Sequence, residues 1–177
     1  MVLVLSGMRA FIVCTIFVFC CLAIGCKGFA FRTPSKNMQP AINPGDTCIV
    51  DRFSEVKIQR FDIVVFSAPE TAKKISRETG DVKYMSRIIG LPNEKIEIKD
   101  SKVFINDKLL EEPFEKFTGD TDQRKNVPAA VIPENEYFVM GDNRPFSFDS
   151  RSWNPATIRK EDVLGKVIEI LPIDVKK

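Results

Sequence analysis

The chain of 177 residues contains no histidine. Catalytic triads and dyads that use an imidazole base, and most zinc sites, depend on histidine, so both classes are excluded within this chain. Charge is also absent from most of the N-terminal region: apart from Arg9, every charged side chain lies from Lys27 onward. All 24 acidic residues and 25 of the 26 basic ones lie in this remainder, which is therefore close to neutral and gives no basic surface for nucleic acid.

Cysteines are few outside the N-terminal region. Cys14, Cys20, Cys21 and Cys26 lie within an apolar run, and only Cys48 follows it. A disulfide framework needs paired cysteines within the folded domain, so none is expected here. Cys48 lies in the strand-like run T-C-I-V and is interpreted as a small buried hydrophobic residue.

An uncharged, apolar segment of 17 residues separates Arg9 from Lys27. A membrane-spanning helix needs about 17–25 such residues, so we expect a single transmembrane anchor within residues 1–28. A second interpretation is a lipoprotein signal, because L-A-I-G-C ends in small residues before Cys26, whose lipidation would then anchor the chain. A third, a buried core helix, fits poorly because the segment is apolar on all sides.

Residues 29–177 are expected to form one mainly β domain. Several runs alternate apolar and polar residues, as in I-E-I-K and K-V-I-E-I, which is the period of a half-buried strand. The turn at Asp100 and Ser101 and the N-D pair at 106–107 predict hairpins. Residues 70–79 and 118–127 are polar and are expected to be loops. The predicted strands are 47–52, 62–67, 82–90, 95–99, 102–105, 136–140 and 166–171.

Three motifs follow one another along this domain. Residues 34–42 read P-S-K-N-M-Q-P-A-I, residues 84–94 read Y-M-S-R-I-I-G-L-P-N-E, and residues 141–151 read G-D-N-R-P-F-S-F-D-S-R. In this order, behind an apolar segment, they resemble type I signal peptidase, a Ser-Lys protease that removes signal peptides. The third motif is the most specific of the three.

The resemblance implies an antiparallel β-barrel or sandwich fold and needs no cofactor or metal. It also implies signal peptides or exported pre-proteins and membrane lipid as partners. The location would be the cell membrane, crossed once, with the folded domain on the extracytoplasmic side. Charge does not fix this orientation, because Arg9 lies on one side of the apolar segment and Lys27, Arg32 and Lys36 on the other.

The two catalytic positions of the family are substituted in this chain. The family's nucleophile is the serine before the methionine of the first motif, and Asn37 stands there. The general base is the lysine before the arginine of the second motif, and Ser86 stands there. A carboxamide has no ionisable proton and a serine cannot serve as the base, so we expect impaired catalysis.

Neighbouring residues offer an alternative site. Ser35 or Ser86 would supply the hydroxyl, and Lys36 or Lys83 the base. In a strand alternate residues share a face, so Lys83 is expected to point away from Ser86. Such a site would therefore need an irregular backbone.

Other positions match the family's supporting residues. By resemblance, Ser35 contributes to the oxyanion hole and Ser147 orients the base. Asp149 and Arg151 match a charged pair that supports the site, and Met38 and Pro40 match residues near the substrate cleft. Each also has a purely structural interpretation, as turn chemistry, an ion pair or a solvated hydroxyl. Phe61 and Asn93 stand where the family usually has glycine, and both changes affect turns.

Overall fold

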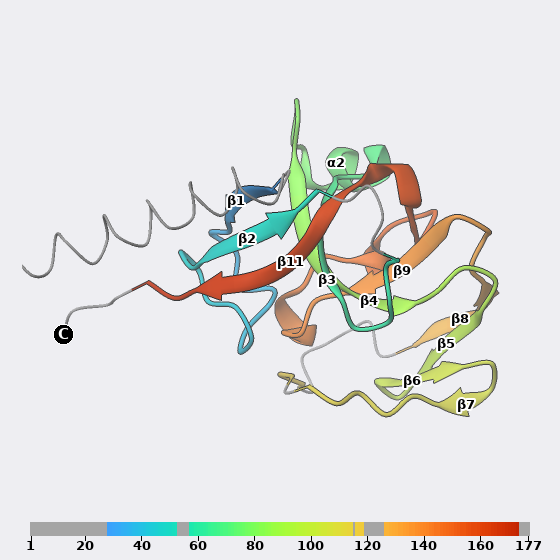
Figure 1. Ribbon diagram of the computed structural model, residues 1–177. Coiled ribbons are helices and arrows are strands. Elements are labelled where there is room, and N and C mark those ends of the chain that lie inside the picture. Colours follow the sequence, from blue (N-terminus) through green and yellow to red (C-terminus); the bar gives the residue numbers. More distant parts are fainter. Residues whose placement is uncertain (1–27, 53–56, 115, 119–125, 174–177) are drawn as a thin grey trace, which may run out of the picture.

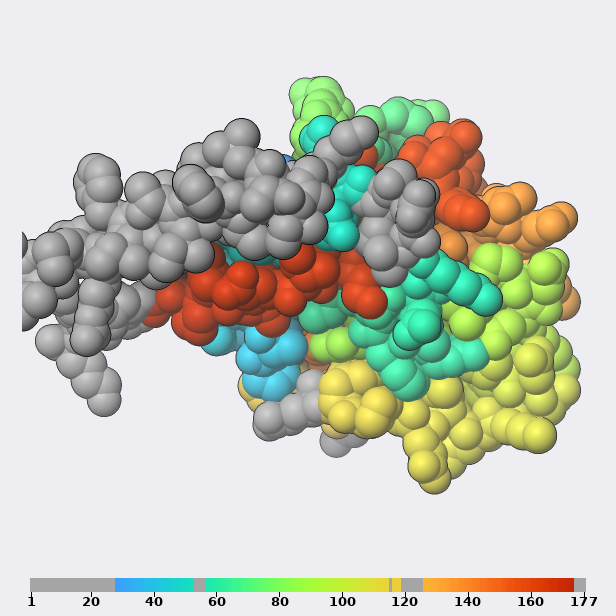
Figure 2. Space-filling view, in the orientation of Figure 1, coloured from blue at the N-terminus to red at the C-terminus, as the bar shows by residue number. Residues whose placement is uncertain are grey.

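The computed structural model describes residues 28–52, 57–114, 116–118 and 126–173. Within them the strands form two antiparallel sheets that lie side by side (Figure 1). In the space-filling view the yellow and yellow-green residues that follow β4 form the lower right part of the molecule (Figure 2). The larger has the order β1 (Gly28–Arg32), β2 (Thr47–Asp51), β11 (Val163–Leu171), β3 (Ile63–Ser67), β4 (Lys83–Gly90), β9 (Glu136–Met140) and β10 (Ile158–Arg159). The smaller has the order β7 (Lys108–Leu109), β6 (Lys102–Ile105), β5 (Lys95–Lys99) and β8 (Val127–Val131).

The mainly β prediction is confirmed, but the predicted barrel is not closed. In the described part of the chain β1 and β10 are the two edges of the larger sheet and do not pair with each other. The C-terminal strand β11 instead lies between β2 and β3 and pairs with both, although these two strands belong to the N-terminal half of the chain. The domain is therefore built from two open sheets.

One predicted loop contains a helix. Residues 70–79 include α2 (Glu70–Ser76), which ends at Arg77 in the left-handed conformation. Only Ala72 of this helix is buried, so the apolar stripe by which helices are recognised is missing. Three short 3₁₀ helices complete the described structure: η1 (Arg144–Phe146), η2 (Ser150–Ser152) and η3 (Lys160–Asp162).

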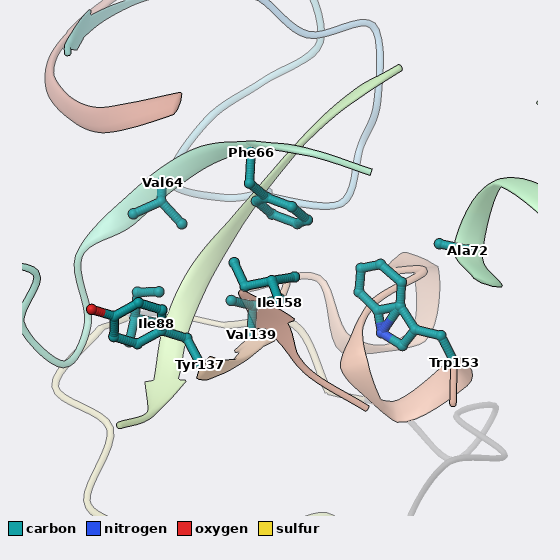
Figure 3. Packing of buried hydrophobic residues seen from close by; sticks show 8 residues of the cluster. All are labelled: Val64, Phe66, Ala72, Ile88, Tyr137, Val139, Trp153 and Ile158. Carbon is teal, nitrogen blue, oxygen red and sulfur yellow. The ribbon is translucent and has the colours of Figure 1, made fainter. Parts of the chain in front are cut away.

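Side-chain alternation along the strands divides the core over the two faces of the larger sheet. Val64 and Phe66 point into one cluster, where they meet Ala72 of α2 and Trp153 (Figure 3). Val65, between them, points into the opposite cluster with Met38 and other apolar residues. This is the period of two expected for a strand buried on both faces. A third cluster, which includes Ile89 and Phe138 of the larger sheet and Ile96 and Ile98 of β5, joins the two sheets.

The predicted hairpins are confirmed. Asp100 and Ser101 both have positive φ and connect the paired residues Lys99 and Lys102. Asn106 and Asp107 do the same between β6 and β7. Two consecutive residues with positive φ are typical of the tight turn whose twist matches a hairpin.

Three strands were not predicted: β1, β8 and the two-residue β10, which pairs with β9. β1 lies directly after the apolar segment and alternates between exposed and half-buried residues against β2. β8 contains Pro128 and is largely exposed, and it lies at the edge of the smaller sheet, where proline is tolerated. Cys48 is a buried free thiol, as predicted.

The N-terminal predictions lie outside the described residues. These are the anchor within residues 1–28, of which only Gly28 is described, and lipidation at Cys26. Within the described ranges, no helix has both the length and the apolar character needed to cross a membrane.

Candidate functional site

A cleft with a volume of 370 Å³ opens where the first and second sequence motifs meet. Residues of the segment before β2 form one side and the start of β4 the other. The cleft brings together both substituted positions, Asn37 and Ser86, with Ser35 and Lys83. Its apolar lining includes Phe31, Phe146 and Phe148, and its polar lining includes Ser76, Glu78 and Tyr84.

Asn37 is held between two segments that are distant in sequence. Its side-chain Nδ2 donates to the carbonyl oxygen of Met85 on β4 at 2.7 Å. Its backbone carbonyl accepts from the backbone N–H of Asn143, which follows β9, at 2.9 Å. A second bond runs from Asn143 Nδ2 to the carbonyl of Lys36 at 3.1 Å. The first motif is thus tied to both the second and the third.

The start of β4 has one open side. β3 pairs with the whole span from Lys83 to Arg87, whereas β9 pairs only from Arg87 to Gly90. Ile88 exchanges backbone bonds with residues 61 and 62 on the β3 side. The backbone N–H and C=O groups of successive residues point to opposite sides of a strand. Since those of Ile88 point toward β3, those of Lys83 and Met85 point toward the open side. The bond from Asn37 to Met85 agrees with this geometry.

Ser86 is 1% exposed, yet it lines the cleft. Its neighbours two residues away, Tyr84 and Ile88, pack with the cluster of Figure 3, whereas Met85 packs in the opposite cluster. Ser86 therefore lies on the same face of β4 as Tyr84. Its hydroxyl makes no hydrogen bond with the described residues, so it is free to contact a molecule in the cleft.

The alternative catalytic residues are dispersed. Ser35 is exposed, and its hydroxyl accepts from the backbone N–H of Asn37 at 3.2 Å. Lys36 is exposed and does not line the cleft. Lys83 lines the cleft, but its ammonium group forms an ion pair with Asp81. The structure brings neither lysine into hydrogen-bond contact with Ser35 or Ser86.

Ser147 and Asp149 both accept from the backbone N–H of Gly141. The N–H of Gly141 points to both the hydroxyl of Ser147 and Oδ2 of Asp149, each at 3.1 Å. A Cβ at position 141 would lie 2.3 Å from the Ser147 hydroxyl and 2.5 Å from the Asn37 carbonyl oxygen. The third motif therefore needs glycine here because the backbone of the first motif passes so close.

Asp149 and Arg151 form a buried, bidentate ion pair. Arg151 Nε donates to Oδ1 and Nη2 to Oδ2 of Asp149, both at 2.8 Å. The side chain of Arg151 is 2% exposed and that of Asp149 is 0% exposed. Arg151 Nη2 also donates to the carbonyl of Arg144. The pair thus fixes the turn that carries Ser147.

Met38 and Pro40 are placed differently from the cleft residues. Met38 is fully buried in the cluster that contains Met85, and Pro40 follows a cis peptide bond. Neither is among the described residues that line the cleft. Their expected contact with substrate stays a prediction.

By resemblance Asp142, Asn143 and Arg144 match a structural turn of the family, but the contacts of this region were not predicted. Arg87 forms a bidentate pair with Asp142, with Nε to Oδ1 at 2.8 Å and Nη2 to Oδ2 at 2.5 Å. Arg144 pairs with Glu112 in the segment after β7. Ser76 and Glu78 belong to the stretch predicted as a loop, and Tyr84 donates its hydroxyl to Glu78. Burial, followed by the bond to Glu78, raises the pKa of Tyr84.

Known proteins are similar to this chain in sequence and in fold. The family described as signal peptidase, peptidase S26, matches residues 6–171. Signal peptidase I V of Bacillus subtilis is 34% identical over 82% of this chain and 89% of its own length. Thylakoidal processing peptidase 1 of Arabidopsis thaliana is 31% identical over 76% of this chain, which spans 39% of that longer protein.

A solved structure agrees with these matches. The crystal structure of a signal peptidase I from Enterococcus faecalis is 29% identical and superposes with a TM-score of 0.50. The match covers 64% of this chain and 99% of that one. From the matched span, the three motifs and the shared fold, the chain belongs to the signal peptidase family, peptidase S26.

Proposed function

We propose that this protein binds signal peptides or exported pre-proteins through a signal peptidase fold that has lost its catalytic dyad. The observation that carries the proposal is the state of the two catalytic positions. Asn37 and Ser86 line the same cleft, and the Asn37 amide donates to the Met85 carbonyl. Neither side chain supplies an activated nucleophile, and among the described residues neither Lys36 nor Lys83 contacts a serine that would replace it.

The loss removes chemistry but leaves the scaffold. In a serine protease triad, removing one member of the catalytic unit costs roughly 10⁶ in rate, and removing the others adds little more. Oxyanion stabilisation and binding still contribute about 10³–10⁴ over water in that case. Here Ser35, Ser147 and the pair of Asp149 and Arg151 remain in one connected site.

Peptide binding is supported by the open side of β4. The Met85 carbonyl on this side already accepts from Asn37, but the backbone groups of Lys83 and the N–H of Met85 are the kind to which an extended peptide adds as a further strand. Phe31, Phe146 and Phe148 offer apolar contact beside it, and Phe146 is 72% exposed. A peptide with small and apolar side chains, such as the end of a signal peptide, suits this surface.

The proposed location is the cell membrane, with the β domain on the extracytoplasmic side. The support is the apolar segment between Arg9 and Lys27 together with the family resemblance. Lipidation of Cys26 is the competing mode of anchoring. Mass spectrometry of the membrane-extracted protein distinguishes them: an intact Met1 terminus supports the helix, and a diacylglyceryl group on an N-terminal Cys26 supports the lipoprotein.

The test uses the full chain in detergent with a fluorogenic signal-peptide substrate. The wild type is compared with the double variant Asn37→Ser, Ser86→Lys. We expect no cleavage by the wild type and a gain of at least about a hundredfold over background in the double variant. Wild-type cleavage that Ser35→Ala or Ser86→Ala abolishes would instead establish the alternative site with Lys36 or Lys83.

A further inference from the structure

We propose that Glu78 gives the cleft a subsite for a basic side chain, about two residues along a bound peptide from Asn37 and Ser86. The inference rests on the proposed function, because it assumes that an extended peptide lies along β4. It assigns a specificity role to a residue outside the three motifs. Glu78 follows α2, which lies beside the start of β4 (Figure 1).

The carboxylate of Glu78 contacts two hydroxyl groups. Tyr84 Oη donates to Glu78 Oε2, and Ser76 Oγ lies 2.7 Å from the same oxygen and 3.0 Å from the carbonyl oxygen of Ala72. The two hydroxyls are themselves 3.2 Å apart. Because both hydroxyls contact Oε2, Oε1 is left without a partner among the described residues. Glu78 is exposed, and its Oε1 is therefore an unused acceptor with a negative charge that a bound molecule can reach.

The charge of Glu78 is not balanced inside the cleft. Among the described residues that line the cleft, the other charged one is Lys83, and its ammonium group is paired with Asp81. The burial that raises the pKa of Tyr84 keeps its hydroxyl protonated, so it remains a donor to Glu78. A cationic group of the ligand would therefore complement the Glu78 carboxylate. A lysine or arginine side chain supplies such a group and forms a charge-assisted hydrogen bond with the carboxylate.

The position along the peptide follows from strand geometry. Tyr84 and Ser86 are two residues apart on one face of β4, a separation of roughly 6.6 Å. A peptide that pairs with the open side advances at the same rate. The peptide residue that lies beside Tyr84 and Glu78 is therefore two positions away from the peptide residue that lies beside Ser86 and Asn37.

The test is a lysine scan. A fluorescent peptide of alanine and other small residues, and variants with one lysine at each successive position, are titrated by anisotropy against the full chain in detergent. We expect one position to bind about three- to tenfold more tightly than norleucine at the same place, with the advantage lost at high salt. Glu78→Gln should remove the advantage, so that this variant binds the lysine and norleucine peptides equally.

Glu134→Gln is the matched control, because Glu134 is exposed and lies outside the cleft. If the peptides bind but lysine gives no advantage at any position, or if Glu78→Gln retains the advantage, this inference is overturned and the proposed function stands. If no peptide binds the wild type, the proposed function is overturned and the subsite with it.

Discussion

The side-chain amide of Asn37 donates to the carbonyl oxygen of Met85, the residue before Ser86, at 2.7 Å. One substituted catalytic position thus contacts the backbone beside the other. The bond uses the N–H of the amide, which neither aspartate nor alanine can supply. Asn37 therefore acts as a structural link between the first motif and β4.

This link predicts the order of stability of two variants. Asn37→Ala should cost about 1 kcal/mol, and Asn37→Asp about 2 kcal/mol, because a carboxylate cannot donate and adds repulsion to the unpaired carbonyl. Urea denaturation followed by the fluorescence of Trp153, the single tryptophan, measures both. Asn106→Asp is the control, because the Asn106 side chain accepts from Lys95 and aspartate retains that role. Equal stability of Asn37→Asp and wild type would contradict the prediction.

Gly141 should not tolerate a side chain. A Cβ there would lie 2.3 Å from the Ser147 hydroxyl and 2.5 Å from the Asn37 carbonyl oxygen, so Gly141→Ala must displace one of them. We expect a loss of about 3 kcal/mol in unfolding free energy and loss of peptide binding. Gly80→Ala is the comparison: it meets nothing within 4 Å, and its positive φ should cost about 1 kcal/mol. Peptide binding that survives Gly141→Ala would show that binding does not need the close contact between the first and third motifs.

The pair of Asp149 and Arg151 should be important for stability. Arg151→Met leaves a carboxylate buried without its partner, which typically costs about 3–5 kcal/mol. The midpoint of thermal unfolding measures the effect. Arg159→Met provides the contrast, since the pair of Arg159 and Asp162 lies on the surface and such pairs contribute little. Similar decreases in the unfolding midpoint for the two variants would show that leaving Asp149 buried and unpaired does not destabilise the fold.

Cys48 predicts a loss of stability at alkaline pH. Burial, with a smaller contribution from Asp46, raises the pKa of this thiol to about 11. The unfolded thiol ionises near pH 9, so between about pH 9 and pH 11 the unfolded state binds fewer protons and the folded state becomes less stable. Relative to Cys48→Ala, the wild type should lose about 2 kcal/mol over this range. Parallel unfolding curves for the two proteins from pH 8 to pH 11 would refute the raised pKa.

The strands were predictable where one face of the chain is buried and the other is not. Ile96 and Ile98 alternate with polar residues, and β5 was predicted with its exact bounds. α2 was missed because a helix with one buried residue, Ala72, has no periodic signal. β8 was missed because Pro128 and exposed alanines resemble a loop, and only its pairing with β5 makes it a strand.

In the site, too, features that depend on neighbouring residues were predictable, whereas contacts between residues far apart in the sequence were not. Phe61 and Asn93 keep positive φ, at 73° and 66°, although glycine would adopt it at less cost. Phe61 is supported by an edge-to-face contact with Phe114, which lies far along the chain. The meeting of Asn37 with Met85, and of Glu78 with Tyr84, likewise depends on the fold and has no signal in sequence spacing.

The backbone bonds of Asn37 have a consequence for the history of this protein. Its N–H donates to Ser35 and its carbonyl accepts from Asn143, and neither bond depends on which side chain stands at position 37. Codons for asparagine and serine differ by a single base, so a lineage can exchange these residues there in one mutational step without rebuilding the loop. A lysine codon at position 86 lies further from serine, and a buried ammonium group would need new solvation. Ser86, more than Asn37, therefore acts as the evolutionary barrier between this chain and a working peptidase.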